Sequence, residues 1–353
     1  TKTATRSLPN AREQAYYALR HALIPNPISS LLANMFPLHS ITTNGVRLRC
    51  VIEGDGPLAI LVHGWPESWY SWRHQIGPIA AAGFRVVVPD VRGYGGSDAP
   101  EAIEAYAMRQ MIGDVLGVID HFGEKQAILI GHDWGAPIVW NTTALHPDRI
   151  RGVAALSVPY APRGKISSIA LWKQLYAGRF FYQLYFQTPG LAEAEFESDI
   201  RTALRKIYFS GSGDAPKGIF RADKPVNARM LDDLPDPAQL PDWLTKADLD
   251  YYVQQFERSG FRGGLNRYRN QDRDWEEIPE LAGARITRPA CFIAGSRDKV
   301  LRFVPNVDLV ENMKRWVDDL RECKIIDGAG HWIQQERPDE VNGTLRDFLA
   351  GLS

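Results

Sequence analysis

A pentapeptide near the middle of the chain, Gly131-His132-Asp133-Trp134-Gly135, has the residue types and spacing of a nucleophile elbow. An apolar run at 127–130 precedes it, and a segment with helical character at 136–145 follows it. Glycines on both sides let the strand and helix backbones approach closely around a strained central residue, because glycine lacks a Cβ atom. Aspartate is also a good helix N-cap, so the pentapeptide taken alone is equally compatible with an ordinary turn.

Two further reactive residues follow predicted strands later in the chain. Asp298 comes after the apolar run 290–294, and His331 comes after the run 323–326. Sites in open parallel sheets form at the carboxyl ends of the strands. With Asp133, these residues give the order nucleophile, acid, histidine that is found in hydrolase triads. Asp298 as a helix cap and His331 as a hydrogen-bonded loop residue are the alternatives, but three such residues at three strand ends favour a triad.

Three other polar residues close to strand ends have structural interpretations. Asp90 is a competing acid, but the glycine-rich, arginine-containing segment after it suits a structural turn. His63 and His132 have no acid or cysteine at metal-ligand spacing. We therefore expect both histidines to shape loops through hydrogen bonds, and we expect no metal site.

An aspartate in the elbow selects a particular chemistry. The carboxylate is ionised at neutral pH without help from a base, because its unperturbed pKa is about 3.9. Its attack on an alkyl carbon gives an ester that water can cleave, whereas a serine would give an ether. The sequence thus predicts displacement at a tetrahedral carbon through a covalent ester on Asp133. His331, oriented by Asp298, would activate water for the second step.

Hydrolysis of this ester requires an oxyanion hole, and the leaving group decides the substrate. The backbone N–H groups of Trp134 and Trp65 are the predicted oxyanion donors. A halide leaves with N–H donors alone, whereas an epoxide oxygen leaves as an alkoxide and needs a proton. Tyr182 and Tyr268 could supply that proton, because a phenol of pKa about 10 is neutral at physiological pH. Spacing alone favours packing roles for both tyrosines.

The elements that must position these residues alternate between strand and helix. A hairpin with the turn Asn44-Gly45 is followed by apolar runs that read as strands. The predicted elements are the hairpin 41–51, strands 58–62, 85–88, 127–130, 152–158, 290–294 and 323–326, and helices 106–122, 136–145, 304–320 and 338–349. Strands that are apolar throughout indicate a parallel sheet buried on both faces.

The alternation is interrupted by a long helical segment rich in aromatic residues, in which Thr245 is expected to cap a helix. We therefore predict an α/β fold, with a mostly parallel central sheet flanked by helices, over residues 40–159 and 288–353. Residues 160–287 form a predicted inserted helical cap. Residues 1–39 form a predicted helical arm that packs on the main domain, in preference to a membrane-surface or dimerisation helix.

Composition narrows the classes of function. A formal net charge of −1 over 353 residues gives no field that attracts nucleic acid or anionic lipid. No apolar run approaches the roughly 18 residues that a membrane span needs. Cys50, Cys291 and Cys323 lack a C-x-x-C spacing and are expected to be buried thiols of a protein in the reducing cytoplasm. We expect no cofactor, and the sequence leaves a homodimer open.

Taken together, these motifs resemble those of soluble epoxide hydrolases of the α/β-hydrolase superfamily. The segments that carry the resemblance are 63–72, 131–135, 182–187, 256–275 and 330–332, and it extends from about residue 40 to the C-terminus. The resemblance implies an α/β-hydrolase fold and conversion of a small apolar epoxide and water to a vicinal diol.

The resemblance also implies roles for individual residues. Asp133 would be the nucleophile, His331 the base and Asp298 its orienting acid. Tyr182 and Tyr268 would donate to the epoxide oxygen, which reverses the interpretation from spacing.

Trp65, Pro66 and Trp134 would line the substrate site with the two tyrosines, and the bond before Pro66 would be cis. The family usually has phenylalanine where this chain has Trp65, so the larger ring is expected to affect substrate preference. The alternatives are a haloalkane dehalogenase, expected to carry asparagine at that position, and a non-catalytic hydrolase-fold receptor for a small apolar ligand.

Overall fold

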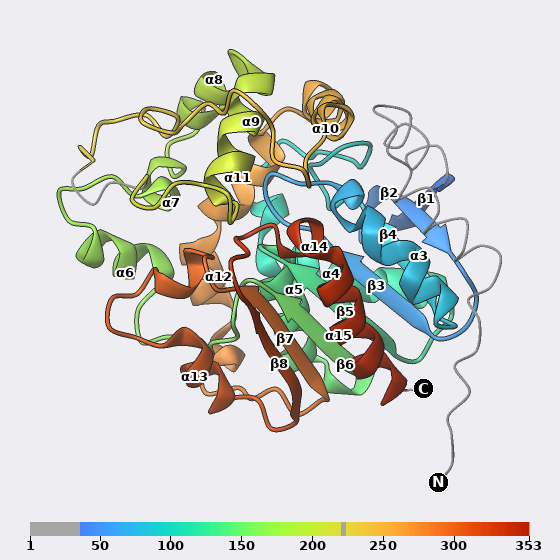
Figure 1. The fold of residues 1–353 in the computed structure, drawn as a ribbon. Helices are drawn as coiled ribbons and strands as arrows, with labels where there is room; N and C mark the ends of the chain where they lie inside the picture. Colours follow the sequence, from blue (N-terminus) through green and yellow to red (C-terminus); the bar gives the residue numbers. More distant parts are fainter. Residues whose placement is uncertain (1–35, 220–223, 353) are drawn as a thin grey trace, which may run out of the picture.

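An eight-stranded sheet is the centre of the computed structural model, which describes residues 36–219 and 224–352 (Figure 1). The strands are β1 (Leu38–Thr43), β2 (Val46–Glu53), β3 (Leu58–Val62), β4 (Arg85–Pro89), β5 (Ala127–His132), β6 (Ile150–Leu156), β7 (Ala290–Gly295) and β8 (Leu320–Ile326). Their order across the sheet is β1-β2-β4-β3-β5-β6-β7-β8. The pairs β1–β2 and β2–β4 are antiparallel, and the remaining pairs are parallel. The predicted mostly parallel sheet is confirmed.

Helices cover both faces of this sheet and also gather beyond its strand ends (Figure 1). The helices that accompany the strands are α3 (Arg73–Ala81), α4 (Met108–His121), α5 (Gly135–Leu145), α13 (Leu309–Lys314), α14 (Ile333–Glu336) and α15 (Pro338–Ala350). Between β6 and β7 the chain forms α6 (Ser168–Leu175), α7 (Tyr182–Tyr185), α8 (Leu191–Glu197), α9 (Ile200–Gly211), α10 (Lys246–Ser259), α11 (Arg262–Arg269) and α12 (Gln271–Glu277). Five short 3₁₀ helices are described as well: η1 (Trp69–Trp72), η2 (Ile103–Tyr106), η3 (Pro147–Arg149), η4 (Pro279–Leu281) and η5 (Val300–Arg302).

The apolar strands are explained by two separate cores, one on each face of the sheet. Along β5, Ile128 and Ile130 belong to the cluster that includes residues of α3 and α15. Ala127 and Leu129 belong to the opposite cluster, with residues of α4 and α5. Because successive side chains of a strand point to opposite faces, a strand buried on both sides must be apolar at every position.

The sequence predicted the boundaries of some helices and strands correctly and those of others incorrectly. The hairpin turn is confirmed, with Asn44 and Gly45 both at positive φ. The helix predicted over 304–320 is wrong at both ends, since α13 covers only Leu309–Lys314. Asn306 has a left-handed φ of 59°, and the Asp308 carboxylate caps the helix that starts after it. Apolar residues around this short helix therefore pack as turns, and a helical period does not continue through them.

The cysteine prediction is correct for two residues and wrong for the third. Cys50 and Cys291 are buried, whereas Cys323 is exposed. Cys323 lies on β8, which is an edge strand that pairs only with β7. Most of the residues of β8 reach solvent, so its cysteine is not enclosed by the sheet.

The helices inserted between β6 and β7 are tied to the core by buried polar contacts. Thr245 caps α10, as predicted, with its side chain accepting the N–H of Asp248. Asp248 then forms a buried ion pair with Arg73 of α3, at 3.3 Å, and accepts a hydrogen bond from the hydroxyl of Tyr70. The predicted boundaries of the cap remain predictions.

The predicted N-terminal arm lies outside the described residues, apart from its end. Strand β1 begins at Leu38, so the last two residues assigned to the arm already belong to the sheet. Within residues 36–219 and 224–352, no helix combines the length and the hydropathy that crossing a bilayer requires.

Candidate active site

The turn between β5 and α5 has the predicted elbow geometry. Asp133 has a φ of 49°, in the left-handed region that few non-glycine residues adopt. A Cβ atom on Gly131 would overlap the carbonyl oxygen of Gly135, and one on Gly135 would overlap the carbonyl oxygen of Val62. Both glycines are therefore required by close backbone contacts, and these contacts hold Asp133 at the end of its strand.

One oxygen of Asp133 lies against the loop after β3. The backbone N–H of Trp65 donates to Asp133 Oδ1 at 2.7 Å. Gly64 approaches the same carboxylate so closely that a Cβ atom there would overlap it. The Trp65–Pro66 bond is cis, as the resemblance implied. Trp134 is the N-cap residue of α5, where the helix dipole favours negative charge, and its part in an oxyanion hole stays a prediction.

His331 connects the other oxygen of Asp133 to Asp298. Its Nε2 lies 3.4 Å from Asp133 Oδ2, and its Nδ1 lies 3.1 Å from Asp298 Oδ2. Asp298 also accepts a 2.9 Å hydrogen bond from the N–H of Val300, so it caps the short turn after β7 as well. The three residues predicted from separate strand ends are therefore brought together in the order of a triad.

Opposing effects set the protonation of this pair. Burial alone would raise the pKa of Asp298, but His331, Ser157 and the Val300 N–H together hold it below its usual value. Burial alone would lower the pKa of His331, but the charges of Asp298 and Asp133 raise it well above its usual value. These shifts favour a protonated His331 imidazole next to an ionised Asp298 carboxylate.

Ser157 is a further member of this group, and the sequence did not reveal it. Its hydroxyl donates to Asp298 Oδ2 and lies 2.7 Å from His331 Nδ1. Ser157 is fully buried, immediately follows β6, and has a φ of 75°. The predicted strand 152–158 included Ser157, and a serine within a strand does not indicate a functional role. Its position at a fourth strand end on the same edge of the sheet is the signal that could have found it.

A buried acid–histidine pair links the loops of the site. His132 Nδ1 lies 2.8 Å from Glu67 Oε2, and His132 Nε2 lies 2.7 Å from the carbonyl oxygen of His331. Glu67 also accepts the N–H of Gly64 at 2.8 Å. Although burial favours the neutral acid, the adjacent His132 lowers the pKa of Glu67 to about 2. These contacts confirm the loop-shaping role expected of His132.

The other two residues with structural interpretations behave as expected. His63 Nε2 accepts the N–H of Val91 at 2.9 Å, and its Nδ1 lies 2.9 Å from the carbonyl oxygen of Gly64. Asp90 is fully buried, pairs with Arg49 and accepts the N–H of Trp69 at 3.0 Å. Among the described residues, no group of histidine, cysteine and acidic side chains could hold a metal ion.

Glu336 holds the loop that carries His331, and no sequence pattern indicates this role. Its buried carboxylate accepts the N–H groups of Gly330 at 2.8 Å and Trp332 at 3.0 Å, the residues on either side of His331. The same carboxylate accepts the N–H of Gly213, two residues after the end of α9. The histidine loop is thus fixed to the inserted helices by one side chain.

A cavity of about 390 Å³ opens beside the nucleophile. Asp133, Trp134, Tyr182 and Tyr268 line it together. The two tyrosine rings lie 5.9 Å apart, and the Tyr268 ring packs edge-on against Trp134 at 5.1 Å. The predicted tyrosine pair is therefore brought to the nucleophile from α7 and α11.

Both phenols are protonated across the physiological range. Burial, followed by the nearby Asp133 charge, raises the pKa of Tyr182 and of Tyr268 far above the usual value. Each hydroxyl can therefore donate a proton.

Trp65 and Pro66 contribute to the site differently from the expectation. Neither is among the residues that line the cavity. The Trp65 ring is buried against Phe186 at 5.1 Å and Tyr268 at 5.9 Å, so it supports the tyrosine from behind. Pro66 accepts a hydrogen bond from the buried Tyr208 hydroxyl through its carbonyl oxygen.

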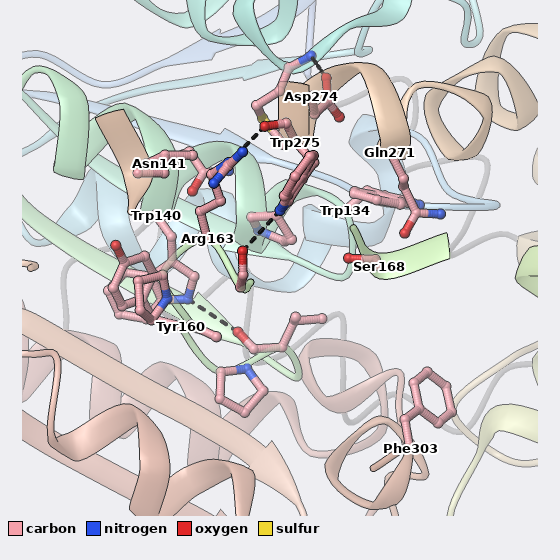
Figure 2. Close-up of a pocket in the computed structure, with 18 of the residues that line it drawn as sticks. Trp134, Trp140, Asn141, Tyr160, Arg163, Ser168, Gln271, Asp274, Trp275 and Phe303 are labelled. Atoms are coloured by element: carbon pink, nitrogen blue, oxygen red, sulfur yellow. Dashed lines mark hydrogen bonds between the residues drawn. The ribbon is translucent and has the colours of Figure 1, made fainter. Parts of the chain in front are cut away.

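The cavity continues along α5, away from the nucleophile, and its walls are mainly aromatic and aliphatic. In Figure 2, Trp140 and Asn141 lie on the left and Trp134 on the right, with Arg163 and Trp275 between them. Asn141 lies eight residues after Asp133, which corresponds to roughly 12 Å along a helix axis. The site can therefore accommodate an elongated apolar group attached to the reacting centre.

Comparisons with known proteins agree with this geometry. A family model described as alpha/beta hydrolase fold matches residues 57–338. Epoxide hydrolase A of Mycobacterium tuberculosis (strain ATCC 25618 / H37Rv) is 47% identical over 318 residues, which cover 88% of this chain and 97% of the relative.

Two solved structures are similar over nearly their whole length. Epoxide hydrolase A from Mycobacterium thermoresistibile has a TM-score of 0.86 at 48% identity, with 90% of this chain and 99% of the other covered. An epoxide hydrolase from an endophytic Streptomyces has a TM-score of 0.86 at 45% identity, with 90% and 96% covered.

Proposed function

The chain belongs to the epoxide hydrolases of the α/β-hydrolase fold family, and we propose that Asp133 opens the epoxide and His331 with Asp298 releases the diol. The observation that carries this assignment is the position of the Asp133 carboxylate. One of its oxygens receives the Trp65 N–H, and the other faces His331 Nε2. A carboxylate held in this way can act as a nucleophile and can then be regenerated by water.

Ring opening uses the two oxygens of Asp133 differently. Oδ1 is held by the Trp65 N–H, so Oδ2 attacks the epoxide carbon and Oδ1 becomes the carbonyl oxygen of the ester. The carbon–oxygen bond of the epoxide breaks, and its electron pair stays on the epoxide oxygen. Tyr182 and Tyr268 donate to that oxygen, and one of them gives up its proton.

Ester formation changes the charge next to His331. The ester is neutral, so the Asp133 charge that helped to raise the pKa of His331 is lost. The proton that His331 releases restores the one that the tyrosine gave up, and the neutral imidazole becomes a base. It takes a proton from water, and the resulting hydroxide attacks the ester carbonyl carbon.

The tetrahedral intermediate places negative charge on Oδ1 of Asp133. The Trp65 N–H already points at this oxygen, and the Trp134 N–H is the proposed second donor. Each such donor typically lowers the barrier by roughly 3–4 kcal/mol. Collapse breaks the bond between the acyl carbon and Oδ2, and the leaving alkoxide takes the proton held by His331 to become the diol. The Asp133 carboxylic acid, which keeps one oxygen from water, then returns its proton to His331.

We further propose that the substrates are small apolar epoxides. The cavity has a volume of about 390 Å³, within the range of small-molecule sites of ~300–1,000 Å³. Its lining is dominated by rings and aliphatic side chains such as Trp140, Trp172 and Phe303. The tyrosine pair supports an epoxide in preference to a haloalkane, because a halide leaves without a proton. We also propose a reducing cytoplasmic location, which is supported by the three free thiols.

The assignment is tested by measuring products directly. Diol release from an aryl epoxide, with no halide release from a chloroalkane, is the expected result. In ¹⁸O-labelled water, a single turnover should place the label in Asp133 and leave the first diol unlabelled. Halide release without diol would overturn the assignment, and label in the first diol would exclude the covalent route.

A further inference from the structure

A hydrogen-bonded chain extends from Trp172 through Gln183 to Tyr182. Gln183 is the second residue of α7 and is buried beside the cavity. Its Oε1 accepts the indole N–H of Trp172 at 3.0 Å, and its Nε2 donates to the Tyr182 hydroxyl oxygen at 3.0 Å. Both contacts involve side chains, so the arrangement is specific to these three residue types.

The chemistry of these groups fixes the direction of each hydrogen bond. An indole N–H can only donate, so the amide must present its oxygen to Trp172. The amide nitrogen must then face Tyr182, and the phenol oxygen becomes an acceptor. The Tyr182 proton is consequently turned away from Gln183 and is available toward the cavity that contains Asp133.

The first residue of this chain is held rigidly by its neighbours. The Trp172 ring packs against Phe181 at 5.1 Å, Tyr176 at 6.3 Å and Phe303 at 6.3 Å. These three ring contacts restrict rotation of the Trp172 indole. The orientation of Gln183 is therefore set by packing outside the reacting centre.

We propose that Gln183 is a positioning residue for ring opening, which directs the Tyr182 proton to the epoxide oxygen and stabilises the tyrosinate formed when that proton is transferred. The inference rests on the proposed role of Tyr182 as a proton donor. Burial and the Asp133 charge raise the pKa of Tyr182, and the amide of Gln183 is the contact that opposes them. A hydrogen bond to a developing charge is stronger than one to a neutral oxygen, so this contact strengthens as the proton leaves.

Two substitutions of Gln183 separate this role from packing. Gln183→Leu removes the donor and should slow ring opening by about 10- to 100-fold. Gln183→Glu has the same shape, but its carboxylate can only accept, so Tyr182 would turn its proton to residue 183 and away from the epoxide. The isosteric variant should therefore be the slower of the two near neutral pH, an order that packing would not produce.

The pH dependence of Gln183→Glu gives a signature of its own. Protonated glutamic acid can accept from Trp172 and donate to Tyr182, as the amide does. An unperturbed glutamate has a pKa of about 4.3, and burial raises it. Ring opening in this variant should accelerate as the pH falls from 8 to 5, relative to the wild-type protein over the same range.

The experiment measures single-turnover ester formation with an aryl epoxide, by stopped-flow tryptophan fluorescence and by rapid-quench intact mass. The variants are Q183L, Q183E, Y182F and Y268F, with each Gln183 substitution also placed in both tyrosine backgrounds. Circular dichroism and thermal unfolding check that each variant is folded. The Q183L effect should disappear in the Y182F background and persist in the Y268F background, which is the matched control.

The outcomes distinguish the inference from the proposed function. Slow ring opening in Y182F together with a wild-type rate in Q183L would overturn the role of Gln183 alone. A wild-type rate in Y182F would overturn the proposed role of Tyr182 as a proton donor and, with it, the role of Gln183. An equal loss from Q183L in the two tyrosine backgrounds, with no acid recovery of Q183E, would assign Gln183 to packing.

Discussion

Replacing His331 by glutamine should divide the reaction into a step that still occurs and a step that stops. His331 contacts the oxygen of Asp133 that we expect to attack the epoxide, at 3.4 Å, and is oriented from behind by Asp298. Glutamine keeps a polar group in this place but cannot accept a proton from water. The nucleophile, the Trp65 N–H and both tyrosines are left in position.

The expected size of the effect follows from these roles. Loss of a general base typically costs 10²- to 10⁴-fold in the step that it serves, here the hydrolysis of the ester. Ring opening needs no base, because a carboxylate attacks without losing a proton, so the rate of ring opening should change much less. The ester should therefore accumulate to about one equivalent per active site before any diol appears.

Intact-mass analysis after mixing with epoxide provides the assay. The His331→Gln protein should gain the mass of one whole epoxide, since addition of the carboxylate loses no atoms. Peptide mapping should locate this mass on Asp133, and the Asp133→Ala, His331→Gln double variant should remain unlabelled. Diol formation at the wild-type rate, or a folded His331→Gln protein that never gains mass, would refute the reasoning.

Three other results are expected from the same geometry. Joint replacement of Tyr182 and Tyr268 by phenylalanine should nearly abolish ester formation in a single-turnover assay while the protein remains folded, and retained ring opening would exclude both as proton donors. Ser157→Ala should slow decay of the ester by about tenfold with little change in its formation, because the hydroxyl bonds only the acid and the base; an unchanged decay rate would leave Ser157 a purely structural role. Burial would raise the pKa of Asp248, but Arg73 and hydrogen bonds lower it overall in the folded protein. The ionised carboxylate therefore stabilises the fold above the pKa of about 3.9 that aspartate has in the unfolded chain. This stabilisation is lost as the pH falls through the lower pKa of the folded state. Thermal unfolding between pH 3 and 7 should accordingly show a smaller acid dependence in Asp248→Asn, and an unchanged acid dependence would contradict this sign.

The elbow could be predicted because its requirements are local. The backbone contacts around Asp133 need two glycines and a short apolar strand, and both features can be recognised in the sequence. The alternating elements then place Asp298 and His331 at neighbouring strand ends, because parallel strands point the same way. The spatial proximity of the three residues follows from topology and needed no knowledge of individual contacts.

Residues that act through long-range contacts gave no comparable signal. Glu336 reaches the N–H of Gly213, which is more than one hundred residues away, and Ser157 reaches Asp298 across two strand ends. Gln183 depends on an indole from another helix for its orientation. None of these residues belongs to a local pattern, so only their positions in three dimensions show what they do.

The boundary errors have a related cause. The short helix α13 begins only after Asn306, which has a positive φ, and the cap residue Asp308, although the predicted helix began before both. Cys323 is exposed because β8 ends the sheet, and a strand's position in the sheet is not encoded within the strand. Both errors arise where the fold as a whole overrides a local preference.

We propose that the charge of Asp133 sets the order of the two chemical steps. The charge of Asp298 raises the pKa of His331 most, and the Asp133 carboxylate raises it further, so the protonated imidazole is favoured before the ester forms. We infer that ester formation removes the Asp133 contribution, which lowers the pKa of His331 and makes the imidazole a better acceptor of a proton from water. Formation of the ester on Asp133 therefore also produces the base that hydrolyses this ester. The charge of Asp298 does not change, so Asp298 keeps the imidazole of His331 aligned before and after the ester forms.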